Sequence, residues 1–259
     1  MKFKVIAGPC QHESLEHSLK VIDYCKATAH NTEFDYYFKA SFDKANRTSI
    51  NSKRGLGLEQ TLIDFAEIKA QYPKLKILTD VHERDQVKKI SGIVDVIQIP
   101  AFLCRQTDLI REACDSGCIV NIKKGQFLSP YEVDGIISKT EGAKEVWITE
   151  RGTSFGYNNL VVDMRGIHIM KEAGYTVIFD GTHSCQQPGG QGTSSGGNRN
   201  YVAPLCRAAV AVGIDGLFLE VHDDPDNAPS DGPNMLTFNM YRDVIWTTER
   251  QLKVDYESN

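Results

Sequence analysis

Short runs rich in β-branched and aromatic residues recur along the chain, and each predicts a buried strand. The eight runs span residues 3–7, 36–40, 76–79, 94–99, 119–122, 145–149, 176–179 and 216–219. Most of the intervals between them carry apolar residues at helical spacing, most clearly over residues 58–70, 161–173 and 203–212. Strands that alternate with helices roughly every 20–40 residues indicate parallel βα units.

This alternation predicts an α/β protein with a (β/α)₈ TIM-barrel fold, because eight βα units in about 250 residues match that barrel. A doubly wound open sheet is the alternative, and the lack of a glycine-rich turn after the first predicted strand disfavours it. No linker or low-complexity tract interrupts the pattern. We therefore expect residues 1–259 to form a single barrel domain.

The composition is that of a soluble globular protein, with 41% hydrophobic and 24% charged residues. A net charge of −5 predicts no overall affinity for nucleic acid or an anionic membrane. No apolar run approaches the roughly 20 residues that a membrane span needs. The first residues enter a predicted strand at once and leave no room for a signal peptide. The seven scattered cysteines are an odd number and favour a reduced, cytoplasmic protein.

Polar or charged residues follow every predicted strand. In chain order they are Cys10; Lys39 and Ser41; Asp80 and His82; Gln98 and Pro100; Lys123 and Lys124; Glu150 and Arg151; Asp180 and His183; and Glu220 and His222. In a (β/α)₈ barrel the active site lies at the carboxyl ends of the strands. One rim would then carry nearly all the buried charges, which indicates an enzyme.

The segment after the second predicted strand is a candidate anion cradle. Within eleven residues it places Lys39, Lys44, Asn46, Arg47, Thr48 and Ser49. Such cations and hydrogen-bonding side chains suit phosphate or carboxylate groups. A solvated basic loop is the alternative interpretation of this segment.

Four residues, from three strand ends and the loop after the last strand, suit a borderline divalent metal ion. Cys10, His183, Glu220 and Asp231 offer a thiolate, an imidazole and two carboxylates, which are ligands for Zn²⁺, Fe²⁺ or Mn²⁺. Each also has a structural interpretation: a small buried cysteine, a loop-capping histidine, a carboxylate paired with a lysine, and a turn residue.

Several other features have simpler predicted roles. Cys114 and Cys118 flank a helix-to-strand turn, where Gly117 suits a helix C-cap. His12, His17, His30 and His168 are expected at the surface or at caps. The glycine-rich residues 188–200 predict either a mobile lid or a disordered loop.

Several segments, in collinear order, resemble the 3-deoxy-D-manno-octulosonate 8-phosphate synthase family. They are Ile6-Ala-Gly-Pro-Cys10, Lys44-Ala-Asn-Arg-Thr-Ser49, Thr79-Asp-Val-His82, Gln98-Ile-Pro-Ala-Phe102, Asn121-Ile-Lys-Lys-Gly-Gln-Phe127, Thr149-Glu-Arg-Gly152, Phe155-Gly-Tyr-Asn-Asn-Leu160 and Phe179-Asp-Gly-Thr-His183. The likeness runs from about residue 4 to residue 245. It implies a (β/α)₈ barrel that is usually a homotetramer. It also implies the condensation of phosphoenolpyruvate with D-arabinose 5-phosphate and water, a step toward the Kdo of bacterial lipopolysaccharide.

The resemblance also implies roles for individual residues. Lys123 and Arg151 would bind the phosphate of phosphoenolpyruvate, while Ser41, Lys44, Gln98 and the backbone at Ala101 would hold its remaining oxygens. The sugar phosphate would bind Asn46, Arg47 and Thr48, with Arg105 supplied by a neighbouring subunit. The implied catalytic residues are Lys39, Asp80, His183 and Glu220. The resemblance also implies that Cys10 places this chain with the metal-dependent branch of the family, which has a cysteine at this position. His183, Glu220 and Asp231 match the other three metal ligands of that branch.

Three other functions remain as alternatives. 3-deoxy-D-arabino-heptulosonate 7-phosphate synthase shares the barrel and uses erythrose 4-phosphate, but it normally has Lys-Pro-Arg-Thr where this chain has Lys44-Ala-Asn-Arg-Thr48. A zinc aldolase would lack the paired cations for phosphoenolpyruvate. A catalytically inactive barrel kept as a scaffold is the third alternative.

Overall fold

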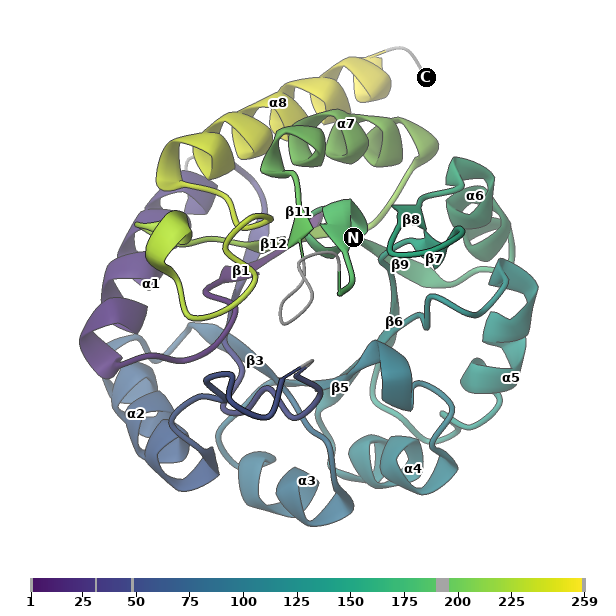
Figure 1. Cartoon of the computed structure of the whole chain (residues 1–259). Coiled ribbons are helices and arrows are strands. Elements are labelled where there is room, and N and C mark those ends of the chain that lie inside the picture. Colours follow the sequence, from purple (N-terminus) through teal and green to yellow (C-terminus); the bar gives the residue numbers. More distant parts are fainter. Residues whose placement is uncertain (1, 31, 48, 190–195, 258–259) are drawn as a thin grey trace.

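The computed structural model describes residues 2–30, 32–47, 49–189 and 196–257. Eight parallel strands close into a barrel in the order β1-β12-β9-β6-β5-β4-β3-β2, so each strand pairs with the next one along the barrel (Figure 1). The strands are β1 (Lys4–Gly8), β2 (Asp35–Lys39), β3 (Lys76–Asp80), β4 (Val96–Ile99), β5 (Ile119–Lys123), β6 (Val146–Glu150), β9 (Thr176–Asp180) and β12 (Gly216–Glu220). The predicted (β/α)₈ fold and all eight predicted strands are confirmed.

The described residues form eight α-helices, which surround the barrel (Figure 1). They are α1 (Leu15–His30), α2 (Leu58–Gln71), α3 (Arg84–Ile90), α4 (Thr107–Asp115), α5 (Val133–Ile137), α6 (Met164–Glu172), α7 (Val202–Val212) and α8 (Phe238–Glu257). The three helices predicted most clearly are α2, α6 and α7. Helix α6 begins three residues later than predicted, because the side chain of Asp163 caps it by accepting from the backbone N–H of Arg165.

In the described part of the chain, the loops also contain two hairpins and five single-turn 3₁₀ helices. The hairpins pair β7 (Thr153–Ser154) with β8 (Leu160–Val161) and β10 (Gln186–Gln187) with β11 (Gly196–Gly197). The 3₁₀ helices are η1 (Ala101–Leu103), η2 (Pro130–Glu132), η3 (His183–Cys185), η4 (Arg199–Tyr201) and η5 (Pro225–Asn227). The predicted glycine-rich lid lies partly in residues 190–195, outside the described residues, so it stays a prediction.

A small apolar cluster fills the barrel interior beneath the carboxyl ends of the strands. Its buried members come from seven strands and are Ile6, Tyr37, Leu78, Val96, Trp147, Ile178 and Phe218. Alternate strand residues point inward, and each of these seven strands contributes one member. The ammonium of Lys123 lies 3.2 Å from the centre of the Phe218 ring. The apolar cluster therefore fills the barrel interior beneath the charged residues at the carboxyl ends of the strands.

Gly8 allows the end of β1 to approach the end of β2. A Cβ atom on Gly8 would lie 2.1 Å from the carbonyl oxygen of Lys39, much closer than any side chain tolerates. The approach places the carbonyl of Cys10 within 2.7 Å of the Lys39 ammonium. A glycine is needed here so that Cys10 and Lys39 can share the rim.

The histidine predictions are partly wrong. His30 and His168 are exposed, as predicted. His12 is fully buried. Its ring nitrogens lie 2.8 Å from Ser18 Oγ and 2.7 Å from Asp64 Oδ2, and these polar partners allow the ring to be buried. A buried histidine with partners for both nitrogens cannot be recognised without knowing that α1 and α2 pack beside it.

The cysteines match the prediction of a reduced protein. All seven, each of them a described residue, are buried free thiols. Cys114 and Cys118 flank a turn in which Gly117 has a φ of 77°, as expected for a helix C-cap. Among the described residues, no helix combines the length and apolarity that crossing a bilayer requires.

Candidate active site

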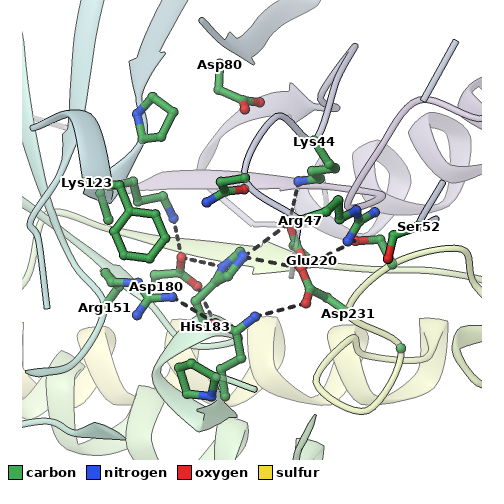
Figure 2. Close-up of a pocket in the computed structure, with 18 of the residues that line it drawn as sticks. Lys44, Arg47, Ser52, Asp80, Lys123, Arg151, Asp180, His183, Glu220 and Asp231 are labelled. Atoms are coloured by element: carbon green, nitrogen blue, oxygen red, sulfur yellow. Dashed lines mark hydrogen bonds and ion pairs between the residues drawn. The ribbon is translucent and has the colours of Figure 1, made fainter. Parts of the chain in front are cut away.

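A polar cavity of about 480 Å³ opens at the carboxyl ends of the strands. Its described lining includes five cationic side chains, namely Lys39, Lys44, Arg47, Lys123 and Arg151. It also includes five acidic ones, namely Asp80, Asp180, Glu220, Asp226 and Asp231. Figure 2 shows Lys123 and Arg151 at one side, Lys44 and Arg47 at the other, and His183 and Glu220 between them. The cavity thus has two cationic ends separated by a group of metal-ligand residues.

Most of the predicted site residues line this one cavity. They are Lys39, Lys44, Asn46, Arg47, Asp80, Gln98, Ala101, Lys123, Arg151, His183, Glu220 and Asp231. Cys10 and Ser41 lie just behind the lining, where Cys10 Sγ is 3.2 Å from Asp231 Oδ2 and Ser41 Oγ accepts from Lys44 at 3.0 Å. Thr48 lies outside the described residues. Arg105 is exposed and does not line the cavity of its own chain.

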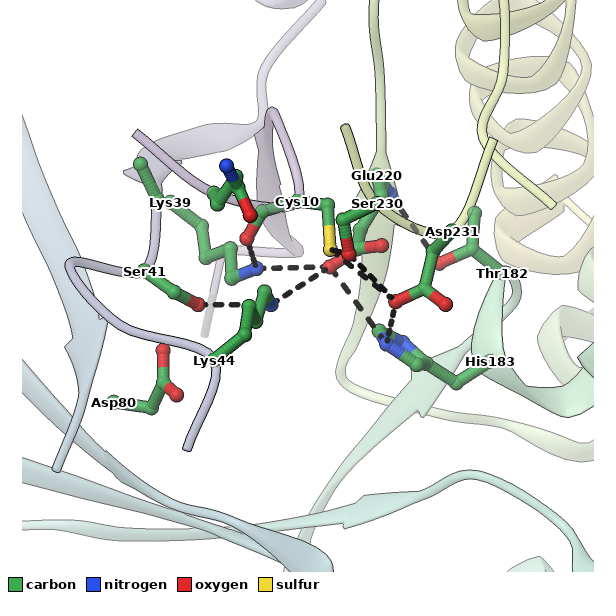
Figure 3. Close-up of polar contacts among 12 residues, drawn as sticks. Cys10, Lys39, Ser41, Lys44, Asp80, Thr182, His183, Glu220, Ser230 and Asp231 are labelled. Carbon is green, nitrogen blue, oxygen red and sulfur yellow. Dashed lines mark hydrogen bonds and ion pairs between the residues drawn. The ribbon is translucent and has the colours of Figure 1, made fainter. Parts of the chain in front are cut away.

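The candidate metal ligands converge from the ends of β1, β9 and β12 and from the loop after β12. Cys10, Glu220 and Asp231 each present a ligand atom within 4.8 Å of the other two. His183 Nε2 lies 3.7 Å from Glu220 Oε1 and 3.9 Å from Asp231 Oδ2 (Figure 3). Glu220 Oε2 is buried and has no hydrogen-bond partner among the described residues. A thiol, an imidazole and two carboxylates around an unpaired oxygen fit a divalent cation.

The electrostatics of the group also favour a cation. Burial, and then the neighbouring Glu220, raise the pKa of the Cys10 thiol well above its usual value. Burial alone would raise the pKa of Glu220, but Lys39, His183 and Lys44 outweigh it and hold that pKa well below the usual range. A thiol that resists ionisation next to an ionised carboxylate becomes a thiolate ligand only when a positive ion offsets the charge.

Lys39 joins the ends of three strands. Its buried ammonium donates to the Cys10 carbonyl at 2.7 Å and to Glu220 Oε1 at 2.8 Å. The β2 lysine therefore holds the residue that follows β1 and the last residue of β12. Lys44 adds a second cation 3.9 Å from the same Glu220 oxygen.

Asp180 organises the other side of the cavity, a role that sequence analysis did not assign. Its carboxylate pairs with Lys123, lies 2.7 Å from His183 Nδ1 and accepts from the backbone N–H of His183 at 2.9 Å. A carboxylate on the outer nitrogen directs His183 Nε2 toward a metal. The position of Asp180 at the end of β9 was the available signal, but its partner Lys123 comes from the end of β5.

Gln186 was not predicted as a site residue either. Its side chain connects Arg151 to the candidate metal ligand Asp231. Its amide donates to Asp231 Oδ1 at 2.9 Å and its carbonyl accepts from Arg151 Nη2 at 3.0 Å. Asp231 itself has a φ of 50°, in the left-handed region that aspartate enters more readily than most residues. The strand pattern contained no signal for Gln186, because it lies in the loop beyond β9.

A second cluster of potential ligands lies beside the cavity at Glu13, His17 and His222. His222 Nδ1 accepts from the backbone N–H of Asp224 at 2.9 Å, and its Nε2 lies 2.9 Å from Glu13 Oε1. A neutral His222 must therefore carry its proton on Nε2 and donate to Glu13. In that tautomer neither ring nitrogen of His222 has a lone pair free for a metal. The contacts of this cluster therefore serve to link the loop after β1 to the loop after β12.

Lys123 gives the site a pH dependence that can be measured. Burial, which outweighs the attraction of Asp180, lowers the pKa of Lys123 to about 8. Lys123 is positive below that pH and neutral above it, so affinity for a phosphate ester should be lost as the pH rises through about 8.

We expect kcat/KM for the phosphoenolpyruvate implied by the resemblance to fall on this alkaline limb. Lys123→Arg keeps a charge at every accessible pH and should move the limb to higher pH, even if its absolute rate is lower. Rate profiles of both proteins from about pH 6 to about pH 10 provide the check. An alkaline limb at the same pH in both proteins would show that another group titrates.

The comparisons with known proteins agree with this geometry. The sequence profile of the DAHP synthetase I family matches residues 1–254. A protein of Rhodopseudomonas palustris named 2-dehydro-3-deoxyphosphooctonate aldolase is 55% identical over 250 residues, covering 95% of this chain and 87% of the relative. Proteins of the same name from Rickettsia bellii and Bartonella bacilliformis are 53% and 52% identical over 247 and 243 residues, covering 95% and 93% of this chain and 90% and 86% of each relative. The chain therefore belongs to the DAHP synthetase I family, and within it the chain is similar to the 2-dehydro-3-deoxyphosphooctonate aldolases.

Proposed function

We propose that this chain condenses phosphoenolpyruvate with D-arabinose 5-phosphate and water, giving 3-deoxy-D-manno-octulosonate 8-phosphate and inorganic phosphate. The observation that carries the proposal is a single cavity with a cationic group at each end and a metal-ligand group between them. Two phosphate esters need two such ends. The enzyme is a transferase of Kdo biosynthesis, in agreement with the names of its relatives.

Phosphoenolpyruvate would bind at the end formed by β4, β5 and β6. Lys123 and Arg151 would face its phosphate at this end, and Lys44 with Ser41, from the loop after β2 on the other side of the cavity, would face its carboxylate. Asn121 donates to Gln98 Oε1 at 3.2 Å, and Asn121 in turn accepts from Thr149 at 2.5 Å. This buried chain fixes the Gln98 amide so that its N–H groups remain for substrate oxygens, beside the backbone of Ala101.

The sugar phosphate would bind at the opposite end, with Asn46 and Arg47 facing its phosphate. Asp80 is placed to face the sugar hydroxyls. Its Oδ2 lies 3.1 Å from His82 Nε2, while its buried Oδ1 has no hydrogen-bond partner among the described residues. Burial would raise the pKa of Asp80, but His82 and Lys44 outweigh it and hold this pKa well below the usual range, so the carboxylate accepts rather than donates.

The reaction needs three reactants in one geometry, which makes positioning the main task of the protein. C3 of phosphoenolpyruvate attacks the sugar aldehyde, water adds at C2, and the resulting hemiketal phosphate loses phosphate by C–O cleavage. Lys39 lies near the reacting carbons, and the Glu220 carboxylate stabilises positive charge that develops at C2. A bound divalent metal would supply a Lewis acid that orients the aldehyde and a hydroxyl of the sugar.

Asp80 and His183, the two candidates for proton transfer, differ in which of their atoms remain open to the substrate. Both residues are candidates by position. His183 has one ring nitrogen 2.7 Å from Asp180 and the other aimed at the metal-ligand group. When its Nε2 binds a metal, neither nitrogen is free to relay a proton, whereas Asp80 Oδ1 remains open to the sugar hydroxyls.

A phosphate-release assay tests the reaction. The chain would be incubated with phosphoenolpyruvate and either arabinose 5-phosphate, erythrose 4-phosphate or no sugar. We expect phosphate release only with arabinose 5-phosphate. Release only with erythrose 4-phosphate would identify a heptulosonate synthase instead, and no release with any sugar would favour the scaffold alternative.

The metal itself is proposed to be Zn²⁺, Fe²⁺ or Mn²⁺, held by Cys10, His183, Glu220 and Asp231. Cys10→Ala should bind metal more weakly and lose the part of the activity that a chelator removes from the wild type. Cys118→Ala is the matched control, because Cys118 is an equally buried free thiol at the opposite end of the barrel. Metal content by elemental analysis and turnover with and without chelator are the measurements. Full turnover of Cys10→Ala in metal-free buffer would contradict the assignment of Cys10 as a metal ligand.

We also infer a homotetramer in which Arg105 completes a neighbour's sugar-phosphate site. Arg105 is exposed and absent from its own cavity, although the neighbouring Ala101 and Phe102 line it. Large aromatic side chains are exposed on the adjoining loops, namely Phe102, Phe127, Tyr131, Phe155 and Tyr157. Exposed apolar groups of this size are typical of subunit contacts.

A mixing experiment tests shared sites. Arg105→Ala and Lys123→Ala chains should each be nearly inactive, because each lacks one substrate cation. Mixed tetramers would contain sites with an intact Lys123 from one chain and an intact Arg105 from the other, so co-expression should restore activity. Activity no greater than the sum of the separate variants, in a preparation shown by native mass spectrometry to be mixed, would contradict the inference.

A further inference from the structure

Ser230 lies between the metal-ligand group and the sugar-phosphate end. It immediately precedes Asp231 and is buried. Its hydroxyl oxygen is 2.9 Å from Cys10 Sγ and 2.7 Å from Arg47 Nη1. Figure 3 shows Ser230 beside Cys10 and Asp231. One small side chain therefore contacts a candidate metal ligand and a candidate phosphate ligand at once.

The direction of these hydrogen bonds follows from the donors available. A guanidinium has only donors, so the Ser230 oxygen accepts from Arg47. The single hydroxyl hydrogen then remains for another acceptor. Cys10 Sγ at 2.9 Å is nearer than Asp231 Oδ2 at 3.5 Å, so the hydrogen is directed to the sulfur. The result is a relay from Arg47 through Ser230 to Cys10.

Such a relay strengthens when the sulfur is charged. A metal-bound cysteine is a thiolate, and a hydrogen bond to an ion is roughly twice as strong as one between neutral groups. The Arg47 guanidinium polarises the hydroxyl that it donates to, which makes that hydroxyl a better donor. Two further contacts restrict Arg47, at Gln11 Oε1 (2.9 Å) and the Lys53 carbonyl (3.0 Å), but neither Gln11 nor Lys53 hydrogen-bonds to the sulfur in the described structure.

We propose that Ser230 is a positioning residue that couples the metal site to the sugar-phosphate site. The inference rests on the proposed function, because it takes Cys10 as a metal ligand and Arg47 as a phosphate ligand. Metal binding strengthens the Ser230–Cys10 hydrogen bond and so holds the Ser230 oxygen in position to accept from Arg47. Because coupling between two binding sites is reciprocal, arabinose 5-phosphate tightens metal binding by the same factor that metal tightens sugar-phosphate binding.

The test uses Co²⁺ as a spectroscopic probe of the cysteine–metal bond in the full chain. Co²⁺ affinity would be measured by chelator competition, and the thiolate-to-Co²⁺ charge-transfer band by absorption, each with and without arabinose 5-phosphate. The variants are Ser230→Ala, which removes the hydroxyl, Ser230→Thr, which keeps it, and Gln11→Ala. The Gln11 variant is the matched control, because it loosens Arg47 but leaves the hydrogen bond to sulfur.

We expect Ser230→Ala to weaken Co²⁺ binding by about tenfold, to shift the charge-transfer band and to reduce the coupling to arabinose 5-phosphate. Ser230→Thr should restore the band and the affinity. Gln11→Ala should raise the KM for arabinose 5-phosphate while leaving the band at its wild-type position. A purely structural role for Ser230 would lower stability without moving the band, so thermal unfolding of each variant is recorded in parallel.

Two failures are distinguishable. A wild-type band and affinity in Ser230→Ala, while Cys10→Ala abolishes the band, would overturn the coupling and leave the proposed function standing. No thiolate band in the wild type would overturn the metal site, and the coupling with it.

Discussion

The two hydrogen bonds donated by the buried Lys39 ammonium hold the candidate active site together. The ammonium joins the Cys10 carbonyl to Glu220 Oε1 and so connects β2 with the ends of β1 and β12. A buried ion pair is weak evidence for stability, because desolvation offsets most of the attraction, but removing one partner typically costs about 3–5 kcal/mol. Lys39 also lies over Phe218, on the apolar floor of the cavity. The chain therefore keeps this pair for the site that it organises.

Charge compensation extends from Lys39 across the whole rim. Five cationic and five acidic side chains line the described part of the cavity, and three of the cations pair with carboxylates from other strands. Lys123 with Asp180 and Lys39 with Glu220 are the two buried pairs at its centre. Pairing lets so many charges share one end of a barrel, while the unpaired oxygens of Asp80 and Glu220 mark the places where a ligand completes the arrangement.

Polar contacts connect the candidate metal ligands to the cationic side chains at both ends of the cavity. Gln186 connects Arg151 to Asp231, and Asp180 connects Lys123 to His183. Ser230 makes the corresponding connection between Arg47 and Cys10 on the other side. The candidate metal ligands are thus held by residues that we propose to bind the two phosphates, which is the arrangement expected when positioning is the main source of rate.

The sequence by itself determined the barrel, its eight strands and most of the rim. Alternation of short apolar runs with helical patterns specifies parallel βα units, and parallel strands present their carboxyl ends on one face, so Lys39, Asp80, Lys123 and Glu220 had to meet. The closed barrel was needed to show which charges pair, that His12 is buried against Asp64, that Asp180 holds Lys123 and His183, and that Gln186 and Ser230 belong to the site. Those contacts join loops from different strands, and residues on different loops have no fixed sequence spacing. Their distances therefore exist only once the barrel has closed.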